Sequence, residues 1–196
     1  MNHHEWLTLL HAYVSVAELC ALNERFADVN TIVRQGEQRL RDAGLSEKKA
    51  RAISTPNEAA IEAALLWLED ERHHLLTYGS DEYPELLAQI RGAPLALFVN
   101  GNIDALHLPS LAIIGSRNPT RGGISNAVEF SRHMARSGYA IVSGLAQGID
   151  TAAHSGALEA GGRTVAFLGH GIDRVYPPQN HELAHLLSYL NLRHSL

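Results

Sequence analysis

Cysteine is almost absent from this 196-residue sequence, in which Cys20 is the only one. An internal disulfide and a multi-cysteine metal site are therefore both excluded. Long apolar runs are missing too, and no stretch of about 18 apolar residues could form a membrane-spanning helix. Residues 1–5 carry neither the basic region nor the apolar core of a secretory signal. We therefore expect a cytoplasmic protein that makes no membrane contact.

Positive charge is scarce as well, with 16 basic against 21 acidic residues and a net charge of -5. This balance argues against a broadly basic surface of the kind that coats nucleic acid. The deficit lies in residues 1–105, which hold nine basic and sixteen acidic residues, whereas residues 106–196 hold seven basic and five acidic ones. The second part of the chain can therefore accept an anionic ligand, although its charge does not require one.

The first part of the chain, residues 1–72, is predicted to be a small helical domain. Apolar residues recur there at three- and four-residue spacing, the pattern of amphipathic helices. The expected helices cover residues 5–13, 16–26, 29–43, a short segment from Ser46, and a segment that is capped by Thr55, has Pro56 at its first helical position and runs to Glu71.

Such a bundle could be a DNA-binding helix-hairpin-helix unit, which presents backbone amides to phosphate through a glycine-containing hairpin. No glycine occurs before Gly36. We therefore favour a structural or protein-contact role for this domain, and direct DNA binding is the open alternative.

Residues 73–110 are expected to connect this domain to the next. Short apolar runs predict strands at residues 75–78 and 95–99, with a short helix over residues 85–90 between them. We expect these strands to extend the edge of the sheet that the following residues form.

Residues 111–196 have the pattern of an α/β domain with a Rossmann-like parallel sheet and flanking helices. Apolar runs predict strands at residues 111–114, 140–142 and 164–168, at spacings that suit right-handed crossovers. The first run is continuous, as in a central strand buried on both faces. In such sheets ligands bind beyond the carboxyl ends of the strands, and all three of these ends are rich in glycine.

The first strand end is a candidate phosphate site formed by Gly115, Ser116 and Arg117. The glycine permits a sharp exit from the strand, and the serine hydroxyl lies beside backbone amides near a helix start, where anions bind. The Arg117 guanidinium adds a planar fork of donors for phosphate oxygens. The alternative is that Arg117 pairs with a carboxylate such as Asp150 and braces the loop.

The second strand end adds Ser143, Gly144, Gln147 and Gly148 to the candidate residues for phosphate or single-stranded DNA. The two glycines would let the backbone pass close to a ligand, and Asp150 could cap the next helix. His154, on that helix, could contact a ligand or have a structural role.

The third strand end covers residues 169–173 and continues to Tyr176 and Asn180. Tyr176 could stack on a base or pack against the protein, and Asn180 is expected to cap a final helix.

Several cofactor and metal sites are excluded by the same residues. A dinucleotide fingerprint needs glycine where Arg117 stands, and no acidic residue directly follows the second strand to hold a ribose. A serine hydrolase needs a Gly-x-Ser-x-Gly turn, which is absent. His181 and His185 lie four residues apart, but they lack an evident third zinc ligand. We therefore expect no cofactor and no metal.

Three motifs resemble those of the DNA-processing protein A family (DprA, also called Smf). They are AIIGSR at residues 112–117, VSGLAQGIDTAAH at residues 142–154 and GHGIDRVYP at residues 169–177. The resemblance extends upstream through YPELL at residues 83–87 and PLALFVNGN at residues 94–102. The helical start is similar, less specifically, to the N-terminal SAM-like domain of that family.

The resemblance implies a function in natural transformation. Family members bind single-stranded DNA through a Rossmann-like domain and load the RecA recombinase onto it, they tend to dimerise, and they are not known as enzymes. The Gly-Ser-Arg turn is part of the family's DNA pocket, which carries over to Gly115, Ser116 and Arg117.

The resemblance also implies that residues 111–196 are the front half of a longer domain. The family's domain continues through an Arg-Asn-Arg stretch and a Ser-Gly-rich turn, whereas this sequence stops at Leu196. We therefore expect this chain to be an incomplete version that is marginally stable, self-associates and binds DNA poorly.

Two alternatives remain open. Nucleoside-monophosphate phosphoribohydrolases share the first turn, but they need a Pro-Gly-Gly-x-Gly-Thr loop, which is absent from the sequence. A partner-interaction fragment that does not bind DNA is the second alternative.

Overall fold

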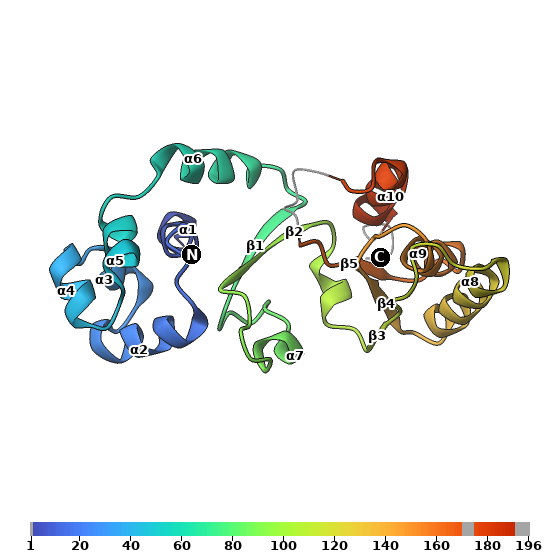
Figure 1. Cartoon of the computed structure of the whole chain (residues 1–196), viewed down its shortest axis with the longest axis horizontal. Helices are drawn as coiled ribbons and strands as arrows, with labels where there is room; N and C mark the ends of the chain where they lie inside the picture. Colours follow the sequence, from blue (N-terminus) through green and yellow to red (C-terminus); the bar gives the residue numbers. More distant parts are fainter. Residues whose placement is uncertain (1, 170–174, 191–196) are drawn as a thin grey trace. The chain divides into compact units, whose positions relative to one another are not determined.

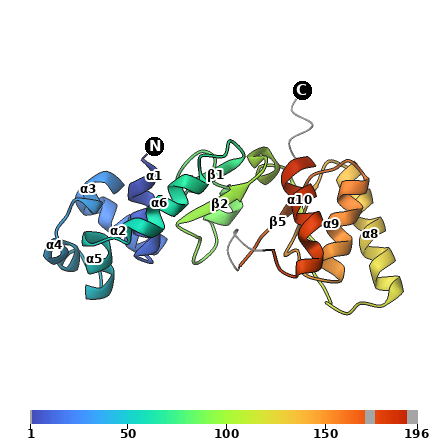
Figure 2. The same ribbon diagram turned by 90° about the horizontal axis from the view of Figure 1, so that it is seen from above.

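The computed structural model describes residues 2–169 and 175–190. It divides the chain into two compact units, Met1–Val99 and Asn100–Leu196, so the segment that we expected to be a connector contributes to both. Figure 1 shows the elements along the chain, and Figure 2 shows them from above.

The first unit begins with short helices, as the apolar spacing predicted. They are α1 (His3–His11), α2 (Val16–Phe26), α3 (Val29–Val33), α4 (Glu37–Asp42), α5 (Glu47–Ser54) and α6 (Glu58–Trp67). The single helix predicted over residues 29–43 is wrong, because the chain turns at residues 34–36 and Gly36 takes the N-cap position of α4. The predicted cap of α6 is wrong too. Asn57 accepts the N–H of Ala60, whereas the Thr55 hydroxyl donates back to the carbonyl of Arg51 at the end of α5.

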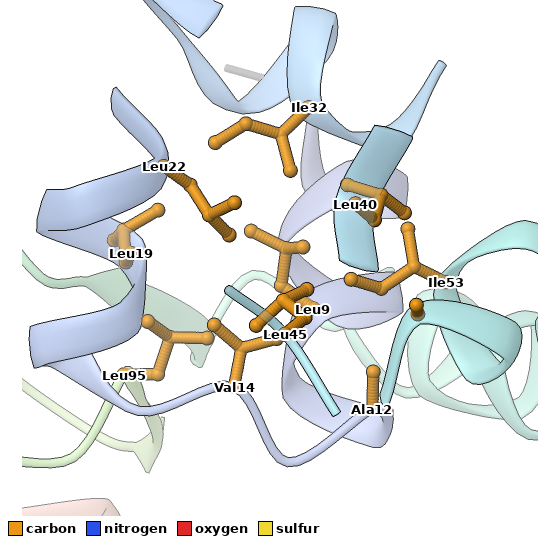
Figure 3. Close-up of a cluster of buried hydrophobic side chains, with 11 residues drawn as sticks. Leu9, Ala12, Val14, Leu19, Leu22, Ile32, Leu40, Leu45, Ile53 and Leu95 are labelled. Atoms are coloured by element: carbon orange, nitrogen blue, oxygen red, sulfur yellow. The ribbon is translucent and has the colours of Figure 1, made fainter. Parts of the chain in front are cut away.

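The core of this unit lies between α1, α2, α3, α4 and α5. Figure 3 shows its side chains converging from these helices. The fully buried members include Leu9, Ile32 and Leu40, and Leu95 joins them from the segment before the second strand. The helices are too short to be stable alone, so this shared apolar cluster holds them together.

Strands β1 (His73–Thr77) and β2 (Ala96–Asn100) form a two-stranded sheet of their own, with α7 (Glu85–Ala88) between them in sequence. The expectation that they extend the main sheet is therefore wrong for the residues that the structure describes. Trp67, at the end of α6, stacks on His73 and meets Phe98 edge-on. These aromatic contacts, with Leu7 and Ile61 buried nearby, pack β1 and β2 against the helices.

The second unit confirms the α/β class. After the 3-10 turn η1 (Ile103–Leu106), the elements are β3 (Ser110–Ala112), α8 (Arg121–Arg136), β4 (Ala140–Ser143), α9 (Ile149–Glu159), β5 (Thr164–Ala166), η2 (Pro178–Asn180) and α10 (His181–Leu190). The three strands are parallel in the order β3-β4-β5, with Leu111 opposite Ile141 and Val142 opposite Val165.

Among the described residues, strand β3 lies at an edge of this sheet, whereas its apolar run is typical of a central strand. Ala112 is exposed, and the Ile114 side chain is 78% exposed. The central strand of the described sheet is β4, where Ile141 is fully buried. An edge strand with exposed apolar residues can pair with other chains, so self-association remains a prediction.

Helices α8 and α9 lie side by side in both views (Figure 1 and Figure 2). Gly156 makes this close approach possible, because a Cβ there would overlap the Val128 carbonyl oxygen and the Ser131 hydroxyl. That hydroxyl is buried and donates to the Ala127 carbonyl at 2.7 Å. Ala153, on the inner side of α9, is fully buried as well. Small residues therefore set the distance between the two helices.

Adding one methyl group at this contact should destabilise the protein. Gly156→Ala should lower the free energy of unfolding by about 1–3 kcal/mol, because the packed backbone of α8 must move. Gly122→Ala, in the first turn of α8, is the matched control, since a Cβ there meets nothing within 4 Å. The control should be neutral or more stable by up to about 1 kcal/mol. Urea denaturation measures both, and equal stability of the two variants would contradict the packing argument.

Candidate nucleic-acid site at the strand ends

The turn between β3 and α8 presents the first group of candidate residues. Gly115, Ser116 and Arg117 are all exposed there. The Ser116 hydroxyl accepts the N–H of Asn118 at 3.0 Å, and Thr120 caps α8 by accepting the N–H of Gly123 at 3.1 Å. The turn therefore has local hydrogen bonds that define its shape, and it leads directly into the start of a 16-residue helix.

Arg117 carries the positive charge of this turn. The ion pairs among the described residues do not include it. The alternative in which it braces the loop through Asp150 therefore has no support, since that carboxylate bonds elsewhere. An exposed guanidinium beside a helix start is arranged to meet an anion from solvent.

Asp150 holds the turn between β4 and α9. Its Oδ2 accepts the backbone N–H groups of Gly144 at 3.1 Å and Ala146 at 3.3 Å, and the residue is only 7% exposed. The expectation that it caps α9 is wrong, because Asp150 is the second residue of that helix and Gly148 occupies the cap position. The carboxylate ties together the loop that precedes the helix.

This carboxylate changes what the second turn can bind. Two of its backbone donors already face an internal anion, so fewer remain for a phosphate group. A buried negative charge also repels a second anion at short range. The second turn is therefore less suited to a phosphate than the first, where phosphate binding remains a prediction.

Ser143 and Gln147 occupy different surroundings within the second turn. Ser143 is buried, and its hydroxyl donates to the Ile113 carbonyl at 2.6 Å, which joins β4 to the end of β3. Gln147 is exposed. Phosphate or DNA contact by these residues, and by Gly144, remains a prediction.

Gly148 brings the two turns into direct contact. Its φ is +93°, and a Cβ there would overlap the Ser116 carbonyl oxygen and lie 2.9 Å from the carbonyl carbon of Arg117. The N–H of Ile149 donates to the same Ser116 oxygen at 3.1 Å. A Cβ on Gly115 would in turn lie 2.8 Å from the Ile149 side chain. The glycines thus permit turn-to-turn packing, a reason that differs from the predicted approach of a ligand.

His154 has a structural place in the second unit. It is fully buried on α9, and its Nδ1 lies 2.7 Å from the Thr164 hydroxyl, which donates to the Ile141 carbonyl. Nδ1 is therefore the protonated nitrogen, and the chain of bonds joins α9 to β5 and β4. Burial lowers the pKa of His154 to about 4, an effect that the nearby charge of Asp150 partly offsets.

The third strand end is described only in part. Residues 170–174 lie outside the described residues, and Tyr176 is 63% exposed. Stacking of Tyr176 on a base remains a prediction. Asn180 is buried, and its Nδ2 donates to the Leu145 carbonyl at 2.8 Å and the Thr151 hydroxyl at 2.9 Å, whereas capping of the last helix by this residue remains a prediction. No sequence pattern predicts this contact, because it joins residues 35 positions apart in the chain.

The histidine pair on α10 has the expected geometry of neighbours one helical turn apart. The rings of His181 and His185 lie 5.4 Å apart, and both residues are exposed. Within residues 2–169 and 175–190, no group of three metal-ligating side chains occurs. No helix of that part is long and apolar enough to cross a membrane.

Comparison with known proteins adds independent findings. Residues 74–192 match the family model for DNA recombination-mediator protein A. Protein Smf from Escherichia coli is 38% identical over 145 residues, which cover 74% of this chain and 39% of that protein. DNA processing protein DprA from Streptococcus pneumoniae is 42% identical over 141 residues, which cover 72% of this chain and 50% of that protein. The chain thus spans half or less of these relatives.

Solved structures agree with this match. The X-ray structure of DNA processing protein A from Streptococcus pneumoniae has a TM-score of 0.77 at 28% identity and covers 96% of this chain and 65% of its own. A structure that addresses the single-stranded DNA binding mode of DNA processing protein A from Helicobacter pylori has a TM-score of 0.53 at 28% identity. It covers 60% of this chain and 53% of its own.

Because His154 is buried, we expect the free energy of unfolding to fall in mild acid. Because its pKa is lower in the folded than in the unfolded chain, unfolding takes up a proton between about pH 6.5 and about pH 4. The contribution of His154 to stability is therefore full above about pH 7, decreases by at most about 1.4 kcal/mol per pH unit between about pH 6.5 and about pH 4, and levels off below that. His154→Asn should lose less stability than the wild type between about pH 7 and about pH 5.

Urea denaturation at the two pH values measures this difference. His133→Gln, at an exposed position on α8, is the matched control and should keep the wild-type pH dependence. An identical loss of stability in His154→Asn and the wild type would show that another group is responsible.

Proposed function

This chain belongs to the DNA recombination-mediator protein A family, whose members include Smf and DprA, and on that basis we propose that its second unit contributes part of a binding site for single-stranded DNA. The observation that carries the proposal is the exposed turn of Gly115, Ser116 and Arg117 at the carboxyl end of a parallel strand. This is where open α/β sheets bind their ligands. The protein acts as a binding protein, not as an enzyme.

The DNA backbone is held at the first turn. Arg117 is exposed and outside every ion pair of the described residues, so its guanidinium can form a bidentate contact with a phosphate. The start of α8 adds the positive end of a helix dipole. Asp150 disfavours a second phosphate over the turn after β4, so this turn faces sugar or base.

Single strands are preferred over duplex at this site. The phosphate contact fixes the backbone, and an aromatic side chain such as Tyr176 can stack only on a base that is splayed out of a helix. Tyr176 is 63% exposed and follows the third strand end in sequence. A structural neighbour from Helicobacter pylori was studied for its single-stranded DNA binding mode, which supports the same ligand class here.

The wider role belongs to the same proposal. We infer a cytoplasmic function in DNA uptake and recombination, in which the complete protein protects incoming single strands and loads a RecA-type recombinase, with dimerisation of that complete protein. Family membership supports this role, since the family is one of DNA processing and recombination.

Replacing Arg117 should weaken DNA binding without unfolding the protein. Arg117→Ala should reduce the affinity for an oligothymidylate by about 1–3 kcal/mol, the scale of a lost charge-assisted hydrogen bond. Arg117→Lys should recover only part of it, because the bidentate fork is lost. Arg136→Ala, at the other end of α8 and also exposed, removes the same charge as a control.

Fluorescence anisotropy titrations at several salt concentrations measure these affinities, since phosphate contacts weaken as salt rises. Thermal denaturation runs alongside. Unchanged binding with reduced thermal stability in Arg117→Ala would assign this residue to bracing the loop. Equal affinity for duplex and single strands in the wild type would contradict the proposed ligand.

A further inference from the structure

The positive charge of the first unit is concentrated in one short segment. Residues 34–51 hold six of the nine lysines and arginines of residues 1–99, but only three of the fifteen aspartates and glutamates. The segment therefore carries a net charge of +3. The rest of the unit, with three basic and twelve acidic residues, carries -9. An isolated basic surface on an acidic domain requires an explanation other than overall solubility.

This segment contains a helix-hairpin-helix. Residues 43–46 join α4 to α5, and Gly44 has a φ of +105° with open space around it. Left-handed backbone of this kind favours glycine. The sequence-based preference for a non-DNA role rested on the lack of glycine before Gly36, and it loses its support because the hairpin lies after that residue.

The apolar side of the hairpin is fixed in the core. Figure 3 shows Leu40 from α4, Leu45 from the hairpin and Ile53 from α5 pointing into the same cluster. Leu40 is fully buried, and the other two are at most 6% exposed. The opposite side of the hairpin is therefore held facing solvent.

The solvent side of α5 carries Lys48 and Arg51. They lie three residues apart and so share one face of the helix, both are exposed, and neither takes part in an ion pair among the residues that the structure describes. Arg41 adds a third cation, since its contact with Glu47 is long at 4.0 Å and both side chains are well exposed. Lys49 differs, because it pairs with Glu18 at 2.6 Å and braces α2.

We propose that this hairpin surface, formed by Arg41, Lys48 and Arg51, binds the phosphodiester backbone of duplex DNA. Cations spaced along a rigid surface suit phosphates that are fixed along a double helix. Residues 34–51 contain no aromatic side chain, so the surface lacks the stacking groups with which proteins hold single-stranded bases. Because the contacts are made to phosphates, we expect binding to be independent of the DNA base sequence.

This site is independent of the proposed single-stranded DNA site. It lies in the first unit, whereas Arg117 lies in the second. It also binds duplex DNA, whereas the site in the second unit binds single strands. A protein with both sites could hold a single strand and a duplex at once.

The test is duplex binding by the full chain at low salt, with fluorescence anisotropy of a labelled mixed-sequence duplex. The double variant Lys48→Gln/Arg51→Gln should weaken duplex binding about tenfold and lower the slope of log affinity against log salt by about two. It should leave binding to oligothymidylate unchanged. Arg91→Gln, an exposed position of the same unit outside the hairpin, is the charge control and should retain duplex affinity.

The same loss of duplex affinity in Arg91→Gln would overturn the proposal, because it would show general charge attraction. Absence of duplex binding by the wild type would overturn it too. Polyglutamate serves as a competitor, and displacement of the duplex at equal charge concentration would assign the surface to an acidic protein. Arg117→Ala in the same assay should keep wild-type duplex affinity, which separates this site from the one in the second unit.

Discussion

The contact between two turns determines the geometry of the candidate DNA site. Gly148 has no side chain, so the turn after β4 can lie directly against the backbone of Ser116 and Arg117. The Ile149 N–H then bonds the Ser116 carbonyl, and its side chain fills the space beside Gly115. Any side chain at Gly148 would push these turns apart. The position of the Arg117 backbone therefore depends on the residue that follows the next strand.

Other hydrogen bonds hold the same pair of turns in place. Asp150 accepts two backbone amides of the second turn, the Ser143 hydroxyl bonds the end of β3, and Asn180 bonds the Leu145 carbonyl. Each of these polar groups is buried, where an unpaired partner would be costly. These hydrogen bonds fix the two turns, one of which carries the exposed Arg117 guanidinium. Preorganisation of this kind lowers the cost of ordering a ligand.

The sequence predicted the elements much better than their contacts. Apolar periodicity placed the three parallel strands and most helices, because these patterns are local. The glycine-rich strand ends were found for the same reason. The roles of Asp150 and Asn180 were not predictable from spacing, since each depends on a partner that only the fold brings near. Gly148 was found, but its steric reason lies in a turn 31 residues earlier in the chain.

Two errors have a common physical cause. The apolar run of β3 predicted a central strand, and the strands β1 and β2 were expected beside it, but each strand pair is decided by tertiary packing and not by its own residues.

In the first unit, Gly36 starts a helix and Gly44 makes the hairpin. A glycine in a helical sequence does not by itself say which of these roles it has.

The most direct test of this account is the DNA affinity and stability of Gly148→Ala beside Gly138→Ala. Both glycines have φ near +90°, but a Cβ at Gly138 meets nothing within 4 Å. The two variants share the backbone strain, and only the first separates the turns. Gly148→Ala should lose single-stranded DNA affinity to about the extent of Arg117→Ala, whereas Gly138→Ala should lose stability alone. Wild-type affinity in Gly148→Ala would show that the turn contact does not position Arg117.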